Sequence, residues 1–144
     1  MNARSCPCGA HRSSDDAGIR VLVVDDHPLV RSSLTDLISD EADLIVVGEC
    51  QDGAQVVDAV ERLRPDVVLM DLSMPGMDGL AATEALRAVR PEPRVVVLSA
   101  HAGVRPEVEA AGADALLPKQ LRSGDLLACL RTVVVGCRCC PYCF

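Results

Sequence analysis

Five polar side chains stand just after short aliphatic runs, and their types could do chemistry together. Asp25 and Asp26 follow the first run, Asp71 the third, Ser99 the fourth, and Lys119 comes just beyond the fifth. The carboxyl ends of parallel strands share one edge of a sheet, where loops and helix N-termini also converge with unpaired backbone N–H groups. If the runs are such strands, the five side chains meet at one edge.

Three carboxylates held together repel one another, and each raises the pKa of the others unless a cation lies among them. A hard divalent ion with oxygen ligands suits this cluster, and Mg²⁺ is the natural candidate. Such an ion leaves room for a phosphoryl oxygen, while Lys119 and Ser99 supply a positive charge and a hydrogen bond for the other oxygens. Singly, each residue has an ordinary structural reading as a cap, a turn acid or a surface lysine. Their coincidence at strand ends favours a site that holds phosphate on an acid.

The elements that must position these residues alternate along the chain, with aliphatic runs between segments of helical period. This alternation predicts a parallel sheet with crossover helices, a (βα)5 unit. The runs are continuously aliphatic, as expected when helices cover both faces of the sheet. The predicted strands span residues 19–24, 44–47, 67–70, 95–98 and 115–117.

Apolar residues at helical spacing predict the helices between the strands. Pro28 suits the first turn of the first helix, Asp52 and Asp78 are plausible N-caps of the second and third, and Pro65 ends the second. A fourth helix is expected within residues 104–111, and a fifth is indicated by a leucine- and valine-rich stripe over 126–134.

Length and charge restrict the class of protein. The chain has 144 residues, enough for one domain with a single core. A net charge of -7 without a basic run argues against DNA binding by this chain alone. Its longest wholly apolar run, residues 126–130, is far short of the ~20 residues that cross a bilayer. Residues 1–18 form a polar leader that we expect to be disordered and that resembles no secretory signal, so a cytoplasmic location is expected.

Four motifs resemble the receiver domain of two-component response regulators, a CheY-like module. They are VDDHPLVR at 24–31, DLSMPGMDGL at 71–80, LSA at 98–100 and GADALLPK at 112–119. The first is most similar to the NarL/LuxR-type subfamily, whose members usually carry a C-terminal DNA-binding domain. The resemblance covers residues 19–136 and implies a flavodoxin-like, doubly wound α/β fold with a five-stranded parallel sheet in the order 2-1-3-4-5.

The resemblance also implies roles. Asp71 would be the phosphoacceptor for a phosphoryl group from a sensor histidine kinase. Asp26, Asp25 (through water), Asp71 and the Ser73 backbone carbonyl would hold Mg²⁺. Lys119 would pair with the phosphoryl oxygens, and Ser99 would turn inward to bond them. This carboxylate chemistry agrees with general principles of covalent and metal-assisted catalysis.

Further expectations follow from the same resemblance. Ser73 and His101 occupy positions that tune the lifetime of the acyl phosphate. Such a module is not an enzyme beyond self-phosphotransfer and autodephosphorylation, and it switches partner interactions, here in transcriptional regulation. The resemblance allows a homodimer through the face of helix 4, strand 5 and helix 5, or through helices 1 and 5. Neither nucleic acid nor membrane is expected to contact the chain directly.

Three features depart from the family pattern. Lys119 lies only 20 positions after Ser99, which shortens the fourth helix, and Leu116 stands where the family usually has an aromatic switch residue. No output domain is expected after the fifth helix, because residues 137–144 form a cysteine-rich tail. These features point to a stand-alone or truncated regulator whose readout differs from the usual one.

The tail supplies the alternative hypotheses. Cys137, Cys139, Cys140 and Cys143 could bind zinc, with help from the cysteines at positions 6 and 8, or the tail could be unfolded. The CPYC motif trails a helix instead of starting one, which disfavours redox catalysis. The adjacent acids differ from the Asp-x-Asp of haloacid dehalogenase-type phosphohydrolases, and no glycine-rich turn indicates a dinucleotide. A receiver that binds partners without phosphate remains the other alternative.

Overall fold

The computed structural model describes residues 18–72, 78–100, 102–135 and 142–144. Five parallel strands form one sheet in the order β2-β1-β3-β4-β5, which confirms the predicted fold and strand order. The strands are β1 (Ile19–Val24), β2 (Leu44–Cys50), β3 (Val67–Asp71), β4 (Arg94–Ser99) and β5 (Ala115–Pro118). The helices are α1 (Pro28–Ser39), α2 (Val56–Leu63), α3 (Gly79–Val89), α4 (Arg105–Ala110) and α5 (Ser123–Val134).

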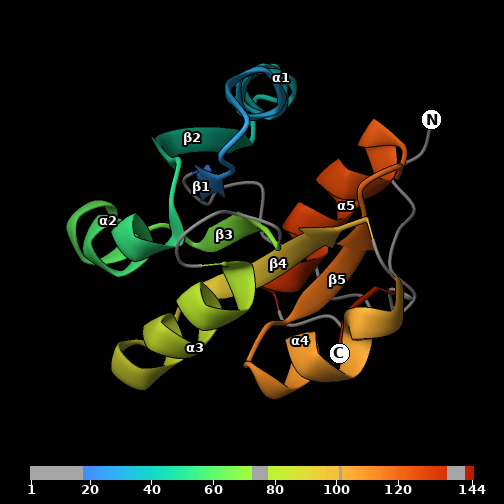
Figure 1. The fold of residues 1–144 in the computed structure, drawn as a ribbon. Coiled ribbons are helices and arrows are strands. Elements are labelled where there is room, and N and C mark those ends of the chain that lie inside the picture. Colours follow the sequence, from blue (N-terminus) through green and yellow to red (C-terminus); the bar gives the residue numbers. More distant parts are fainter. Residues whose placement is uncertain (1–17, 73–77, 101, 136–141) are drawn as a thin grey trace.

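Helices cover both faces of the sheet (Figure 1). One hydrophobic cluster joins alternate residues of the strands to α1 and α5. The other joins the intervening strand residues to α2, α3 and α4. This division explains why the central strands are aliphatic at every position, since neighbouring side chains enter opposite layers of the core.

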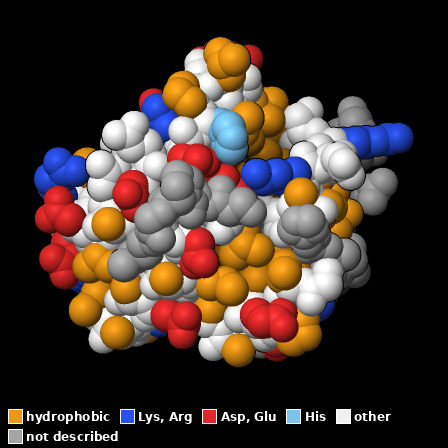
Figure 2. Space-filling model, in the orientation of Figure 1, with side chains coloured by type: hydrophobic (Ala, Val, Ile, Leu, Met, Phe, Trp, Pro, Cys, Tyr) orange, Lys and Arg blue, Asp and Glu red, His pale blue; other side chains and the backbone are white. Residues whose placement is uncertain are grey.

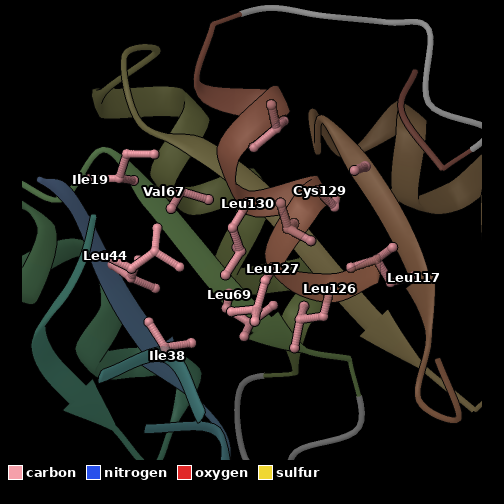
Figure 3. Packing of buried hydrophobic residues seen from close by; sticks show 14 of the residues in the cluster. Ile19, Ile38, Leu44, Val67, Leu69, Leu117, Leu126, Leu127, Cys129 and Leu130 are labelled. Carbon is pink, nitrogen blue, oxygen red and sulfur yellow. The ribbon is translucent and has the colours of Figure 1, made fainter. Parts of the chain in front are cut away.

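Helix α5 anchors its layer through a stripe of large side chains. Leu126, Leu127 and Leu130 come from one side of the helix and point toward the strands, where they meet residues such as Leu69 and Leu117 (Figure 3). All of these side chains are buried. The spacing of these leucines is that of an amphipathic helix packed on a sheet, as the sequence predicts.

Strand β2 differs from the prediction because it lies at the edge of the sheet. It runs to Cys50 instead of residue 47, and its middle is only partly buried. Its register against β1 shifts between Val21 and Leu22. An edge strand has one hydrogen-bonding side open to solvent, so it can include polar residues. A search for continuously aliphatic runs therefore ends the predicted strand too early.

Local signals set the helix boundaries. The Asp52 side chain accepts a hydrogen bond from the backbone N–H of Ala54, capping a short 3₁₀ turn (Gly53–Gln55) that leads into α2. Arg64, with φ 52°, ends α2 in the left-handed conformation, and a helical conformation there is disfavoured by the following Pro65. Asp78 caps α3 through the Ala81 N–H, as predicted.

The end of the chain pairs with β5, a contact that the sequence did not indicate. The Leu116 N–H donates to the Tyr142 carbonyl at 2.9 Å, and the Phe144 N–H donates to the Asp114 carbonyl at 2.9 Å. The guanidinium carbon of Arg105, on α4, lies 4.7 Å from the centre of the Phe144 ring. Residues 142–144 therefore cover part of the outer edge of β5, beside α4 (Figure 1).

Among the helices of the described residues, none has both the length and the apolar character needed to cross a membrane. The leader proposed for residues 1–18 lies outside the described residues except for Gly18.

Candidate functional site

The predicted acids gather where adjacent strands end. Asp25 follows β1 and Asp71 is the last residue of β3, and these strands are neighbours in the sheet. Asp25 and Asp71 are buried, while the side chain of Asp26 is 20% exposed. The fold thus removes two carboxylates from bulk water and leaves a third at the opening.

The cluster includes one residue that the sequence argument missed. Ligand atoms of Asp25, Asp26, His27 and Asp71 all lie within 4.8 Å of one another. The Nδ1 atom of His27 is 3.1 Å from an Asp26 carboxylate oxygen and 3.4 Å from one of Asp25. Figure 2 shows a histidine beside acidic and basic side chains on the face drawn. Its position directly after two acids was the available signal.

Lys119 meets the acids from across the sheet. It follows β5, and its Nζ atom lies 2.8 Å from Oδ1 of Asp71. Ser99, at the end of β4, is buried, and its carbonyl accepts a hydrogen bond from the Lys119 N–H at 3.0 Å. The strand ends therefore bring together four of the side chains that the sequence selected, Asp25, Asp26, Asp71 and Lys119, and they place the backbone of Ser99 beside that of Lys119.

Burial and neighbouring charge act on Asp25 in the same direction. Loss of water raises the pKa of its carboxyl group above the ordinary value, and the charge of Asp71 raises it further. The N–H of His27, which donates to Oδ1 at 2.8 Å, and the charges of Lys119 and His27 offset part of this rise in pKa. Among the described residues, none donates a hydrogen bond to the buried Oδ2 atom of Asp25.

This arrangement fits a divalent cation. Mg²⁺ prefers carboxylate oxygens, and a cation would relieve both the repulsion and the unmet Oδ2 atom. Asp25, Asp26 and Asp71 are the residues that would hold it. His27 offers a nitrogen, which Mg²⁺ prefers less, and its side chain is 63% exposed.

Gly79 allows α3 to begin against the end of β3. A Cβ atom at this position would lie 2.5 Å from the Asp71 carbonyl oxygen and 2.9 Å from the Cα of Leu72. The Gly79 N–H donates to the Leu72 carbonyl at 3.1 Å. The absence of a side chain at position 79 therefore helps to position the backbone of Asp71.

Several predicted residues are not tested by this geometry. Ser73 and His101 lie outside the described residues, as do Cys137, Cys139 and Cys140. Cys143, the remaining member of the predicted thiolate cluster, is buried in the hydrophobic layer under α5.

The fold and the cluster of acids at the carboxyl ends of the strands define a class, the receiver domains of two-component response regulators. The family model described as the response regulator receiver domain matches residues 21–131, and the chain belongs to this family. Receiver domains bind Mg²⁺ at an acidic pocket, and those of response regulators interact with histidine kinases.

Within the family, the chain is similar to regulators of the NarL/LuxR type. The chain is 40% identical over 118 residues to the nitrate/nitrite response regulator NarL of Escherichia coli, covering 81% of this chain and 55% of NarL. It is 37% identical over 121 residues to the transcriptional regulator LiaR of Bacillus subtilis, covering 82% and 57%. The chain thus spans about half the length of these relatives.

Solved structures agree with this assignment. The signal receiver domain of a NarL response regulator from Mycobacterium tuberculosis superposes with a TM-score of 0.80 at 32% identity. The superposition covers 85% of this chain and all of that one.

Proposed function

We propose that this chain is a phosphoacceptor module that takes a phosphoryl group from a sensor histidine kinase onto Asp71, with Mg²⁺ bound at the acidic cluster. The observation that carries the proposal is the 2.8 Å contact between Lys119 Nζ and the buried carboxylate of Asp71, within a cluster of acids. A lysine at this distance is placed to neutralise negative charge that arrives on Asp71.

The step is a group transfer. An Asp71 carboxylate oxygen attacks the phosphorus of a phosphohistidine, the oxygen–phosphorus bond forms, and the phosphorus–nitrogen bond breaks with its electron pair returning to the imidazole. When bound, Mg²⁺ supplies charge neutralisation for the phosphoryl oxygens. Lys119 holds one of these oxygens, and the hydroxyl of Ser99 donates a hydrogen bond to another after a change of rotamer. Water later hydrolyses the acyl phosphate, and we expect Ser73 and His101 to tune its lifetime.

The consequence of phosphorylation is a change of partner binding in the cytoplasm, in the control of transcription. The chain itself is not an enzyme acting on separate substrates, and DNA contact would come from a partner or another domain. A homodimer through α1 and α5, or through the α4–β5–α5 face, is part of this proposal. On the second of these faces, residues 142–144 already cover part of the edge of β5.

The test is the intact mass of the chain after incubation with acetyl phosphate and Mg²⁺. We expect a gain of one phosphoryl group that EDTA prevents and that hydroxylamine removes, as for an acyl phosphate. Asp71→Asn should abolish the gain. Asp52→Asn is the matched control, because asparagine keeps the cap on Ala54 and Asp52 is not one of the clustered acids.

A chain that gains no mass under conditions that phosphorylate another receiver domain would overturn the proposal. The favoured hypotheses would then be partner binding without phosphate, or metal binding by the terminal cysteines. A gain that persists in the Asp71→Asn variant would move the acceptor to another residue.

A further inference from the structure

Arg31 connects the acidic cluster to the edge of the sheet. It lies in the first turn of α1, and its Nη1 atom donates to the backbone carbonyl of Asp25 at 2.7 Å. Its Nε atom donates to a carboxylate oxygen of Glu49, on β2, at 3.1 Å. The arginine side chain is only 17% exposed, although arginine side chains in proteins are mostly exposed.

The backbone of Asp25 is therefore held at both ends. Its N–H donates to the Cys50 carbonyl at 3.0 Å, which extends the pairing of β1 with β2. Its carbonyl accepts from Arg31 on the opposite side. This carbonyl belongs to the peptide that joins Asp25 to Asp26, so the guanidinium group sets the plane from which both carboxylates project.

Short contacts connect Arg31 to the carboxylates that are proposed to hold Mg²⁺. Glu49 holds the guanidinium in place through a charge-assisted hydrogen bond. The Asp25 carboxylate is oriented by one further contact, from the N–H of His27 at 2.8 Å. Removing Arg31 would leave the Asp25–Asp26 peptide free to rotate away from this contact.

We propose that Arg31 is a positioning residue for the divalent-cation site. It acts through its hydrogen bond to the carbonyl of Asp25 and not through the positive charge of its guanidinium group. The inference rests on the proposed function, because it requires that Mg²⁺ bind at the acidic cluster. An arginine could act through positioning or through its charge, and the two predict opposite changes in Mg²⁺ binding when Arg31 is replaced. Loss of positioning weakens Mg²⁺ binding, whereas loss of a nearby positive charge would strengthen it.

The experiment measures the dissociation constant of Mg²⁺ alone, by calorimetric titration of the full chain. Arg31→Met removes the charge and all donors while keeping an unbranched apolar stem, and Arg31→Gln is a second neutral variant. We expect both to weaken Mg²⁺ binding about tenfold, the usual scale for residues that orient metal ligands. Arg31→Lys can still donate to the carbonyl of Asp25 and should restore binding to within about threefold of wild type.

Arg131→Met is the matched control. Arg131 also donates to two acidic side chains, Glu41 and Asp43, but these precede β2 at the opposite end of the sheet. This variant should lower the stability of the fold without changing the dissociation constant of Mg²⁺. If Arg31 had a purely structural role, Arg31→Met would likewise lower the stability of the fold without changing the dissociation constant of Mg²⁺.

An unchanged or lower dissociation constant of Mg²⁺ in Arg31→Met and Arg31→Gln would overturn the inference while leaving the proposed function in place. If wild type binds no Mg²⁺ and gains no phosphoryl group, the proposed function itself fails, and the inference fails with it. Weaker binding in the neutral variants with recovery in Arg31→Lys supports the positioning role.

Discussion

The carboxylate of Asp25 is buried away from water, and this burial lowers the stability of the fold when the group is ionised. Its raised pKa has burial as the largest cause, followed among the raising effects by the charge of Asp71. A group whose folded pKa is raised destabilises the fold when it is ionised, so stability is lost as the pH rises through its titration. The acidic cluster is thus a place where burial of a carboxylate lowers the stability of the protein.

Replacing Asp25 by asparagine should therefore stabilise the chain when no divalent ion is present. The amide keeps an acceptor for the His27 N–H and brings a donor to the neighbouring acids. We expect the free energy of unfolding at pH 7 in EDTA to rise by about 1 kcal/mol, the scale of an unmet buried polar atom. Urea unfolding measures this change.

Two conditions should reduce or reverse this advantage of the asparagine variant. Saturating Mg²⁺ should stabilise wild type and not the variant, because only wild type has the full set of carboxylates. Lowering the pH until Asp25 is protonated should also reduce the difference. An asparagine variant less stable than wild type in EDTA would contradict the cause that we assign to the raised pKa of Asp25.

Gly79 supports the backbone of Asp71, the proposed phosphoacceptor, without any side chain. A methyl group there would collide with the Asp71 carbonyl, so Gly79→Ala should cost about 1 to 3 kcal/mol of stability and slow the phosphorylation of Asp71. Thermal unfolding and the rate of mass gain with acetyl phosphate measure the two effects.

Gly124→Ala is the control for Gly79→Ala. It lies in the first turn of α5 with no atom within 4 Å of the added methyl group, and should be neutral or slightly stabilising. Equal behaviour of the two variants would show that the close approach of α3 to Asp71 is unimportant.

Strand β5 is the element whose environment the sequence described least well. Its outer edge carries residues 142–144, part of the segment that the sequence indicated only as a cysteine-rich tail. The hydrogen bond from Leu116 to Tyr142 and the contact of Arg105 with Phe144 hold this short segment. Because few interactions hold it, the segment should open more readily than the rest of the sheet.

Phe144→Ala should loosen this segment. We expect a loss of about 1 kcal/mol, the scale of a cation–π contact with an exposed arginine, and faster hydrogen exchange at the Leu116 amide. The amide of Val96, in the buried strand β4, should keep its exchange rate relative to global unfolding. Unchanged exchange at Leu116 would show that the pairing with Tyr142 does not depend on Phe144.

At the scale of the whole molecule, one ion-pair group joins distant parts of the chain. Arg131, on α5, donates to Asp43 Oδ2 at 2.7 Å and to Glu41 Oε1 at 2.7 Å. The hydrogen bond from Arg131 is the largest cause of the lowered pKa of Asp43. The contact therefore ties α5 to the loop before β2, between residues that lie 88 and 90 positions apart in the sequence.

The sign of this contribution follows from the lowered pKa of Asp43. A carboxyl group of this kind stabilises the fold above its ordinary pKa, and the contribution disappears as the pH falls through the lowered value. Because the Asp43 side chain is 54% exposed and screened by water, Asp43→Asn should cost only about 0.5 to 1 kcal/mol at pH 7.

Urea unfolding of wild type and Asp43→Asn over a pH series measures this effect. The difference between them should be constant near neutral pH and should disappear in acid, below the lowered pKa. A difference that persists when Asp43 is protonated would assign the effect to packing of the side chain and not to its charge.

The sequence by itself determined the layered fold and most of the site. Continuous aliphatic runs predict a doubly covered parallel sheet, and such a sheet must gather Asp25, Asp71 and Lys119 at one edge, because its strands all end there. These signals are local, set by periodicity and by which residue follows each strand.

Only the tertiary structure decided how those residues are held. It placed Arg31 against the carbonyl of Asp25, Gly79 against that of Asp71, and Tyr142 beside Leu116. Each of these contacts joins backbone groups of different elements, and no periodicity or motif encodes a carbonyl that any residue could supply. The partner of such a group is settled only when the elements pack and every buried polar atom must find a neighbour.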